Sequence, residues 1–196
     1  MFQLEKDYHL QNLIAKLSPL QADHLESLYQ ESQNEGIWKY FLEEGLGRAN
    51  FEAYFFRALD NREKGLEYPF VIKDLRQDAF AGMTRVYHID NQLKNVRVGH
   101  TWIGERFQGS GLNKNGKYLL FEFLFGQLKM QRIGFGASAE NTKSIRAMKA
   151  VGCREEGRFR SFMPGSEGRK RVDVVLLSIL REEWEAEVKG MLKQKI

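Results

Sequence analysis

Cysteine is almost absent from this chain of 196 residues, because Cys153 is the only one. A single thiol can form neither an internal disulfide nor a cysteine-rich metal site, so we expect a reducing compartment, the cytoplasm. The role expected of Cys153 is that of a small buried hydrophobic residue.

Long apolar runs and a strong charge of one sign are missing as well. Residues 1–7 are too charged for the core of a signal peptide, and no later stretch approaches the length of a membrane span. The 30 basic and 26 acidic residues are spread along the chain, unlike the basic footprint of a nucleic-acid-binding protein. We therefore expect neither a membrane nor a nucleic acid as a partner.

What is present is the composition of an ordinary soluble globular protein, with 42% hydrophobic, 29% charged and 12% aromatic residues. The length fits one domain with a substantial core. No internal repeat or linker interrupts the chain, so a single domain is expected over residues 1–196, with its core over about residues 10–184.

The first part of the chain shows one strand pattern and two helix patterns. Alternating apolar residues over 8–17 predict a strand. Ser18 as an N-cap and Pro19 at the first helical position predict a helix that runs to about Ser32. A second helix is expected to begin near Asn50, which can cap it.

The rest of the chain alternates strands and helices. Three strand-like runs joined by polar turns predict an antiparallel meander over residues 68–73, 79–88 and 96–103. The elements expected after the meander are a helix over 112–128, a strand over 133–137, a helix that Asn141 caps and Gly152 ends, and a hairpin formed by 154–163 and 169–180.

A glycine-bearing loop lies between the last strand of the meander and the following helix. Gly109 and Gly111 let consecutive backbone N–H groups converge at the positive end of that helix, and they remove side chains that would block a phosphate. The loop is therefore consistent with an anion site over residues 108–113. A Gly-x-Gly pair alone also suits an ordinary tight turn, so the neighbouring residues decide.

Two families of phosphate-binding loops fit these neighbours poorly. A dinucleotide fingerprint needs a third glycine where Lys114 stands. The segment 111–117 matches a Walker A pattern through Lys117, but Tyr118 occupies the place of the Ser or Thr that binds magnesium. A P-loop nucleotide-binding protein is thus a weak alternative.

The third family is the GNAT superfamily, whose pyrophosphate loop has Arg or Gln, two residues, Gly, one residue and then a small residue. Gln108 and Gly111 fit this pattern, and Asn113 departs from its last position. The sequence Gly-x-Gly-Leu-Asn nevertheless resembles the version found in the RimJ/RimL-like branch, which includes ribosomal-protein N-terminal acetyltransferases.

The resemblance extends beyond the loop, over roughly residues 17–184. Further motifs of this branch occur in the expected order, and together they are more specific than any one alone. They are the strand segment 99–102, Asn141 with Ser144, Val151-Gly152, Glu155-Glu156-Gly157 and the ending 178–184.

The resemblance implies a mixed α/β GNAT fold, with a central, twisted, mostly antiparallel sheet flanked by helices. It implies an N-acetyltransferase of the EC 2.3.1 type, in which a primary amine attacks acetyl-CoA directly. The amine would belong to a protein N-terminus or a small molecule, and the protein would be a monomer or homodimer. A GNAT-fold module that binds acyl-CoA without turnover is the alternative.

The resemblance also implies positions for the cofactor. The strand before the loop and the segment 135–137 would hold the pantetheine arm with unpaired backbone groups. The loop would bind the pyrophosphate, and Asn141 would hydrogen-bond the pantetheine; no metal is needed. The expected cofactor-binding residues are Thr101, Trp102, Ile103, Gln108, Gly109, Ser110, Gly111, Leu112, Asn113 and Asn141.

The catalytic groups follow less directly from the resemblance. Met148 stands where many relatives have a proton-donating tyrosine, so Ser144 is the candidate hydrogen-bond donor to the CoA thiolate. A serine near a helix cap is equally often a plain surface residue. Arg97 replaces a glutamate that often serves as general base, which leaves His100 or a water chain to remove the proton.

Overall fold

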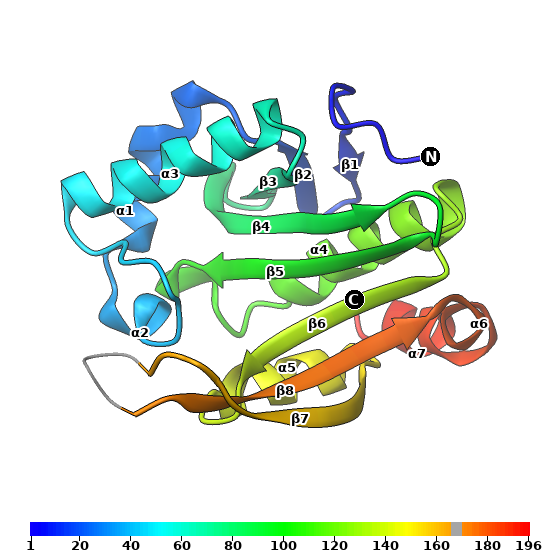
Figure 1. Ribbon diagram of the computed structural model, residues 1–196. Helices are drawn as coiled ribbons and strands as arrows, with labels where there is room; N and C mark the ends of the chain where they lie inside the picture. The colour runs from blue at the N-terminus through cyan, green and yellow to red at the C-terminus, as the bar shows by residue number, and fades with distance from the viewer. Residues whose placement is uncertain (166–169) are drawn as a thin grey trace.

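The computed structural model describes residues 1–165 and 170–196, and it contains one eight-stranded sheet (Figure 1). The strand order is β1-β2-β3-β4-β5-β6-β8-β7, and only the β5–β6 pair is parallel. This is the mixed, mostly antiparallel sheet that was expected. The strands are β1 (Leu10–Gln11), β2 (Ala15–Pro19), β3 (Glu67–Asp74), β4 (Ala79–Asp90), β5 (Asn95–Ile103), β6 (Arg132–Ser138), β7 (Arg154–Met163) and β8 (Val172–Leu180).

Helices cover both faces of the sheet (Figure 1). Neighbouring residues of a strand point to opposite faces of the sheet. Val71 and Ile72 of β3 therefore pack into two different hydrophobic clusters, one on each face. One face carries α1 (Leu25–Ser32), α2 (Glu35–Trp38) and α3 (Arg48–Glu63). The other carries α4 (Leu112–Phe121), which continues as a π-helical turn (Glu122–Gln127), α5 (Thr142–Ala150), and the C-terminal α6 (Arg181–Glu183), π-turn (Trp184–Val188) and α7 (Lys189–Lys193).

The predicted start of the first helix was wrong, because Ser18 and Pro19 belong to strand β2. Leu17 and Pro19 are buried on one face of that strand, and burial of this alternating pattern outweighs the local capping signal. Pro19 pairs with Phe70 beyond the end of the short β1, where its missing N–H removes no bond to that strand. The helix instead follows a 3₁₀ turn at Ala22–His24 and ends at Ser32 as expected.

The second helix begins slightly earlier than predicted. Gly47 is the N-cap of α3, and Asn50 lies in the first turn, where its side chain donates to the carbonyl of Leu46. The meander, the helix after the glycine loop, the strand after it and the terminal hairpin are confirmed within a few residues. The predicted hairpin loop includes residues 166–169, which lie outside the described part of the chain.

The parallel pair β5–β6 determines where the site lies. Its last register pair joins Arg97 to Gly134. Beyond that point β5 continues along β4 to Ile103, while β6 continues along β8 to Ser138. The two strands therefore diverge toward the carboxyl end of β5, and Figure 1 shows their ribbons separating.

Within the described residues, no helix is long and apolar enough to cross a membrane.

Candidate active site

The glycine loop closes the open end of the split between β5 and β6. After β5, a 3₁₀ turn at Glu105–Phe107 leads to Gly109 with φ of 74° and Gly111 with φ of 84°. Both values lie in the left-handed region that side chains disfavour, which explains the two glycines. Gly111 is the N-cap of α4, so the free N–H groups of the first turn of this helix face the loop.

Two cationic side chains hold the loop from either side. Arg76 donates from Nη1 to the Ser110 carbonyl over 3.1 Å, and Lys143 of α5 donates from Nζ to Gln108 Oε1 over 2.6 Å. Gln108 in turn donates from Nε2 to the carbonyl of Ile103 over 2.9 Å, which ties the loop to the end of β5. A pyrophosphate at this helix start would meet free backbone N–H groups and positive charge together.

The remaining loop residues expected to bind the cofactor differ in what their side chains do. Ser110 donates its hydroxyl to the Phe107 carbonyl over 2.6 Å, which shapes the turn. Leu112 is fully buried in the core, so only its backbone can face a ligand. Asn113 is partly exposed at the first turn of α4.

Thr101, Trp102 and Ile103 form the edge of β5 that β6 leaves uncovered. Trp102 and Ile103 pair with Met83 and Gly82 of β4 on the other side. The Trp102 side chain is buried under α1 and α3, so its contribution to the split comes from the backbone. This free edge can accept an extended ligand as an added strand.

Asn141 and Ser144 lie at the start of α5, on the far side of the split. The Asn141 Oδ1 atom accepts the Ser144 backbone N–H over 3.0 Å and caps the helix, as predicted. Among the described residues no group accepts from the Asn141 amide nitrogen, so it can donate to a ligand. Ser144 is a partly buried residue one turn before Met148, which is buried and cannot donate a proton.

Arg97 and His100 lie on the face of the split beneath α1 and α3. His100 has φ of 48° at a register shift of β5, and its ring lies 5.6 Å from that of Tyr87. Burial, aided by Arg85, lowers the pKa of His100 to about 4. A histidine with this pKa is neutral at physiological pH but is a poor base there. Arg97 makes no ion pair within the described residues.

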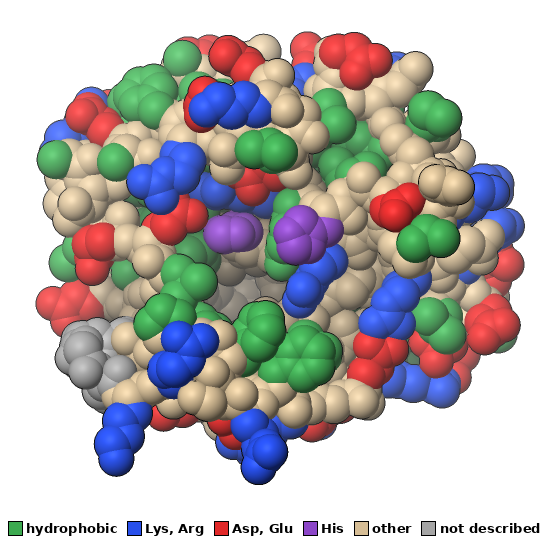
Figure 2. Space-filling model, viewed as in Figure 1, with side chains coloured by type: hydrophobic (Ala, Val, Ile, Leu, Met, Phe, Trp, Pro, Cys, Tyr) green, Lys and Arg blue, Asp and Glu red, His purple; other side chains and the backbone are tan. Residues whose placement is uncertain are grey.

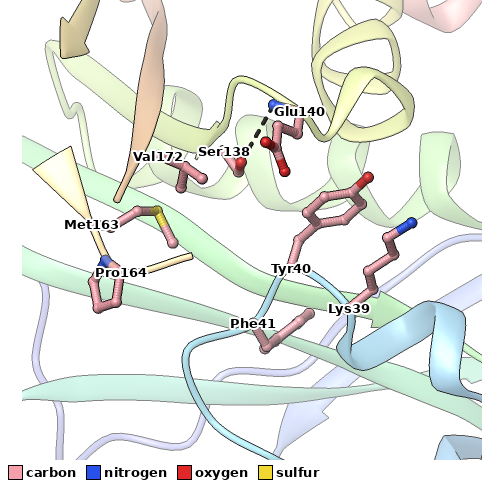
Figure 3. A pocket seen from close by; sticks show the side chains of 8 residues that line it. All are labelled: Lys39, Tyr40, Phe41, Ser138, Glu140, Met163, Pro164 and Val172. Atoms are coloured by element: carbon pink, nitrogen blue, oxygen red, sulfur yellow. Dashed lines mark hydrogen bonds between the residues drawn. The ribbon is translucent and has the colours of Figure 1, made fainter. Parts of the chain in front are cut away.

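A shallow pocket opens beside this face, at the end of β6. Ser138 and Glu140 lie on one side of it and the β7–β8 hairpin on another, while the segment 39–41 between α2 and α3 closes it (Figure 3). The same side of the molecule is hollowed in Figure 2, where two histidine side chains and several hydrophobic ones surround the depression. A molecule entering here would approach the split from the face opposite α4.

The sequence analysis treated Lys117 only as a Walker lysine and did not predict its position against the sheet. Its side chain is buried beneath α4 and points to the sheet, where Nζ donates to the Thr101 hydroxyl over 3.0 Å. A Walker lysine would face the loop and its phosphates. The available signal was a lysine within the apolar stretch of a helix that covers the sheet.

A sheet split between two parallel strands, with a glycine loop and a helix start at its open end, defines the class of GNAT-fold proteins. The family model for the acetyltransferase (GNAT) domain matches residues 15–154. The chain therefore belongs to the GNAT acetyltransferase family, as the sequence resemblance predicted. This result removes the basis for the P-loop alternative.

Relatives in sequence carry acetyltransferase names. The chain is 26% identical over 197 residues to "Putative ribosomal N-acetyltransferase YdaF" of Bacillus subtilis, covering 95% of this chain and 100% of the relative. It is also 26% identical over 161 residues to "Uncharacterized N-acetyltransferase YnaD" of the same organism, covering 81% and 89%. The first of these names agrees with the RimJ/RimL-like branch.

Solved structures share the fold over nearly their whole length. A GCN5-related N-acetyltransferase from Brucella melitensis superposes with a TM-score of 0.88 at 24% identity, covering 99% of this chain and 88% of that one. Mycobacterium smegmatis RimJ in complex with CoA-disulfide gives 0.78 at 17% identity, covering 96% and 93%. Spermidine N-acetyltransferase from Vibrio cholerae, in complex with CoA and spermine, gives 0.71 at 21% identity, covering 89% and 99%.

Proposed function

We propose that this protein, acting as a single GNAT domain over residues 1–196, transfers an acetyl group from acetyl-CoA to a primary amine. The amine belongs to a protein N-terminus or to a small molecule. The observation that carries the proposal is the split between β5 and β6, which leads from the glycine loop into the middle of the sheet. Family membership and acetyltransferase relatives support it.

The residues of the split fit the parts of acetyl-CoA. The N–H groups of 109–113, flanked by Arg76 and Lys143, suit the pyrophosphate. The free backbone edge at 101–103 and the facing segment of β6 suit the amides of the pantetheine arm. The Asn141 amide nitrogen offers a further donor on the same path.

The amine must be neutral to attack the thioester carbonyl, and the site favours that form. The Arg97 guanidinium lies on the face where the amine would enter, and a nearby positive charge disfavours a second one. No carboxylate occupies the position of the usual base, so water removes the proton lost after attack. Arg97 would thus act on the amine through its charge rather than by proton transfer.

Ser144 donates a hydrogen bond to the sulfur as negative charge develops on it. The hydroxyl is free for this role because the helix cap uses the Ser144 backbone N–H and not its side chain. Charge-assisted hydrogen bonds of this kind are roughly twice as strong as neutral ones. The protein otherwise holds the reactants in place and keeps water away from them.

Binding and turnover must be measured separately, because an acyl-CoA-binding module without activity would share this fold. Thermal unfolding with excess acetyl-CoA should show stabilisation by about 2.7 kcal/mol at 100 times the dissociation constant. Release of free CoA thiol should then be followed with peptides of free N-terminus and with small amines. Stabilisation without thiol release for any amine would identify the binding module, and no stabilisation would refute both proposals.

A further inference from the structure

Lys117 is a buried amine that touches both strands of the split from its α4 side. Its Nζ atom lies 3.0 Å from the hydroxyl of Thr101 on β5 and 5.8 Å from the ring centre of Phe135 on β6. It also lies 3.5 Å from the hydroxyl of Thr84, which is 2.7 Å from that of Thr101. The amine therefore lies on the α4 side of the sheet, between Thr101 of β5 and Phe135 of β6, the two strands between which the pantetheine arm is proposed to pass.

No described carboxylate compensates this charge. Both hydrogen-bond partners of Nζ are neutral hydroxyl groups, and the side chain is only 8% exposed. Burial lowers the pKa of Lys117 to about 8. The thiol of Cys153 is the nearby titratable group, but burial raises its pKa to about 12 and keeps it neutral. Burying an ammonium without a counter-charge is costly, so an anion that forms beside it would be stabilised.

Lys117 also lies near the end of α5, where the sequence resemblance implies a proton-donating tyrosine and this chain has Met148. The Met148 carbonyl accepts the backbone N–H of Cys153 over 3.0 Å. Cys153 and Lys117 are near enough for their charges to interact. The lysine amine thus lies close to the segment whose own side chain cannot donate.

We propose that Lys117 is a catalytic residue that stabilises the departing CoA thiolate from the floor of the split and returns a proton to it. This inference rests on the proposed acetyl transfer. The bond from the amine nitrogen to the carbonyl carbon forms, the carbon–sulfur bond breaks, and its electron pair goes to sulfur. Lys117 Nζ gives one proton to sulfur, and the proton released by the amine to water restores the ammonium. Ser144 supplies a hydrogen bond, whereas Lys117 supplies the charge and the proton.

The test is the pKa of the CoA thiol on the protein, followed by the ultraviolet absorption of the thiolate. The measurement uses bound CoA, so it does not depend on the acceptor amine. In the wild-type complex we expect a thiol pKa at least one unit below that of free CoA. Lys117→Met keeps a side chain of similar length but removes the charge. In this variant the ionisation constant of the bound CoA thiol should fall at least tenfold, toward that of free CoA. Lys129→Met, on an exposed lysine beyond the same helix, should match the wild type.

The outcomes separate this inference from the function on which it rests. If CoA does not bind the wild type at all, the proposed function fails. If CoA binds but its thiol pKa equals that of free CoA, the role of Lys117 is refuted without any variant. If the wild type shows the shift and a folded Lys117→Met keeps it, Lys117 is only structural. Where the methionine variant does not fold, Lys117→Gln is to be used, with the same expectation.

Discussion

The Arg97 guanidinium lies so close to Gly136 on the neighbouring strand that a β-carbon on this glycine would come within 2.8 Å of Nη2. Arg97 is the last residue of β5 that pairs with β6, and its side chain follows β6 past the point of divergence. Gly134 and Gly136 leave the space that it occupies. A fixed positive charge therefore lies where the split begins, on the face opposite Lys117.

Replacing Arg97 by glutamine should move the acidic limb of the kcat/KM profile to higher pH. The guanidinium disfavours the ammonium form of a bound amine, so it lowers the amine pKa and allows attack at lower pH. Without the guanidinium the pKa of the bound amine rises. The acidic limb should therefore move to higher pH by about one pH unit, which is equivalent to about 1.4 kcal/mol. His100 does not contribute to this limb, because its pKa of about 4 keeps it neutral there.

The control for this experiment is Arg160→Gln, which removes an exposed cation from the outer strand β7. Its profile should match the wild type at physiological ionic strength, since exposed charges beyond about 8 Å are largely screened. A profile that shifts equally in both variants would mean that only net charge matters. An unshifted profile in Arg97→Gln would contradict the proposed effect of Arg97 on the amine.

His100 should make the protein less stable as the pH falls below its ordinary pKa. The unfolded chain takes up a proton near pH 6.5, whereas the folded protein resists until about pH 4. Between these values the unfolded state binds more protons, so the free energy of unfolding decreases toward low pH by up to about 1.4 kcal/mol per unit. Urea unfolding of wild type and His100→Phe at several pH values measures this slope.

The phenylalanine variant keeps an aromatic ring beside Tyr87 and Phe41 but cannot titrate. Its free energy of unfolding should fall less steeply than that of the wild type over the same pH window. Parallel slopes in the two proteins would show that other groups cause the acid sensitivity. Above about pH 7 the difference between the proteins should be constant, because neither state then takes up a proton at residue 100.

Ser144→Ala should lower kcat by roughly 10- to 150-fold and leave the Kd of CoA nearly unchanged. The lost hydrogen bond forms to a charged sulfur only during the reaction, and such bonds contribute about 1.5–3 kcal/mol. The cap of α5 survives because it uses the backbone N–H of residue 144. Thr142→Ala, on the exposed first turn of the same helix, is the matched control and should retain activity. Equal kcat in Ser144→Ala and the wild type would assign Ser144 to the helix surface.

The glycine loop and the Asn141 cap could be predicted because each rests on a few adjacent residues. Gly109 and Gly111 adopt left-handed backbone, and the Asn141 side chain caps α5 through the backbone N–H three residues later. The start of the first helix could not be predicted, because the burial of Pro19 beside β3 is a long-range contact that opposes the local capping signal of Ser18 and Pro19. Local patterns report local structure, and tertiary burial can override them.

The same limit applies to the candidate site. Arg97, separated by 39 positions from Gly136, is fixed by a strand pairing that the sequence does not state. Lys117 reaches Thr101 only because α4 folds back under the sheet. Periodicity shows that a residue faces the core, but it does not identify which strand the residue meets there. The catalytic groups were therefore harder to predict than the cofactor loop.

The role of the glycine loop can be separated from its backbone strain by comparing Gly109→Ala with Gly65→Ala. The two glycines have φ of 74° and 73°, and an added β-carbon at either would meet nothing within 4 Å. Each variant should therefore lose a similar amount of stability, about 1 kcal/mol, from forcing alanine into left-handed backbone.

Only Gly109 lies where the pyrophosphate is proposed to bind. We expect Gly109→Ala to raise the Kd of CoA at least tenfold by displacing the N–H groups of the loop, while Gly65→Ala leaves it unchanged. Calorimetric titration with CoA, beside thermal unfolding of both variants, measures the two effects. Equal Kd values in the two variants would exclude the loop as the pyrophosphate site, because strain alone would then account for every change at Gly109.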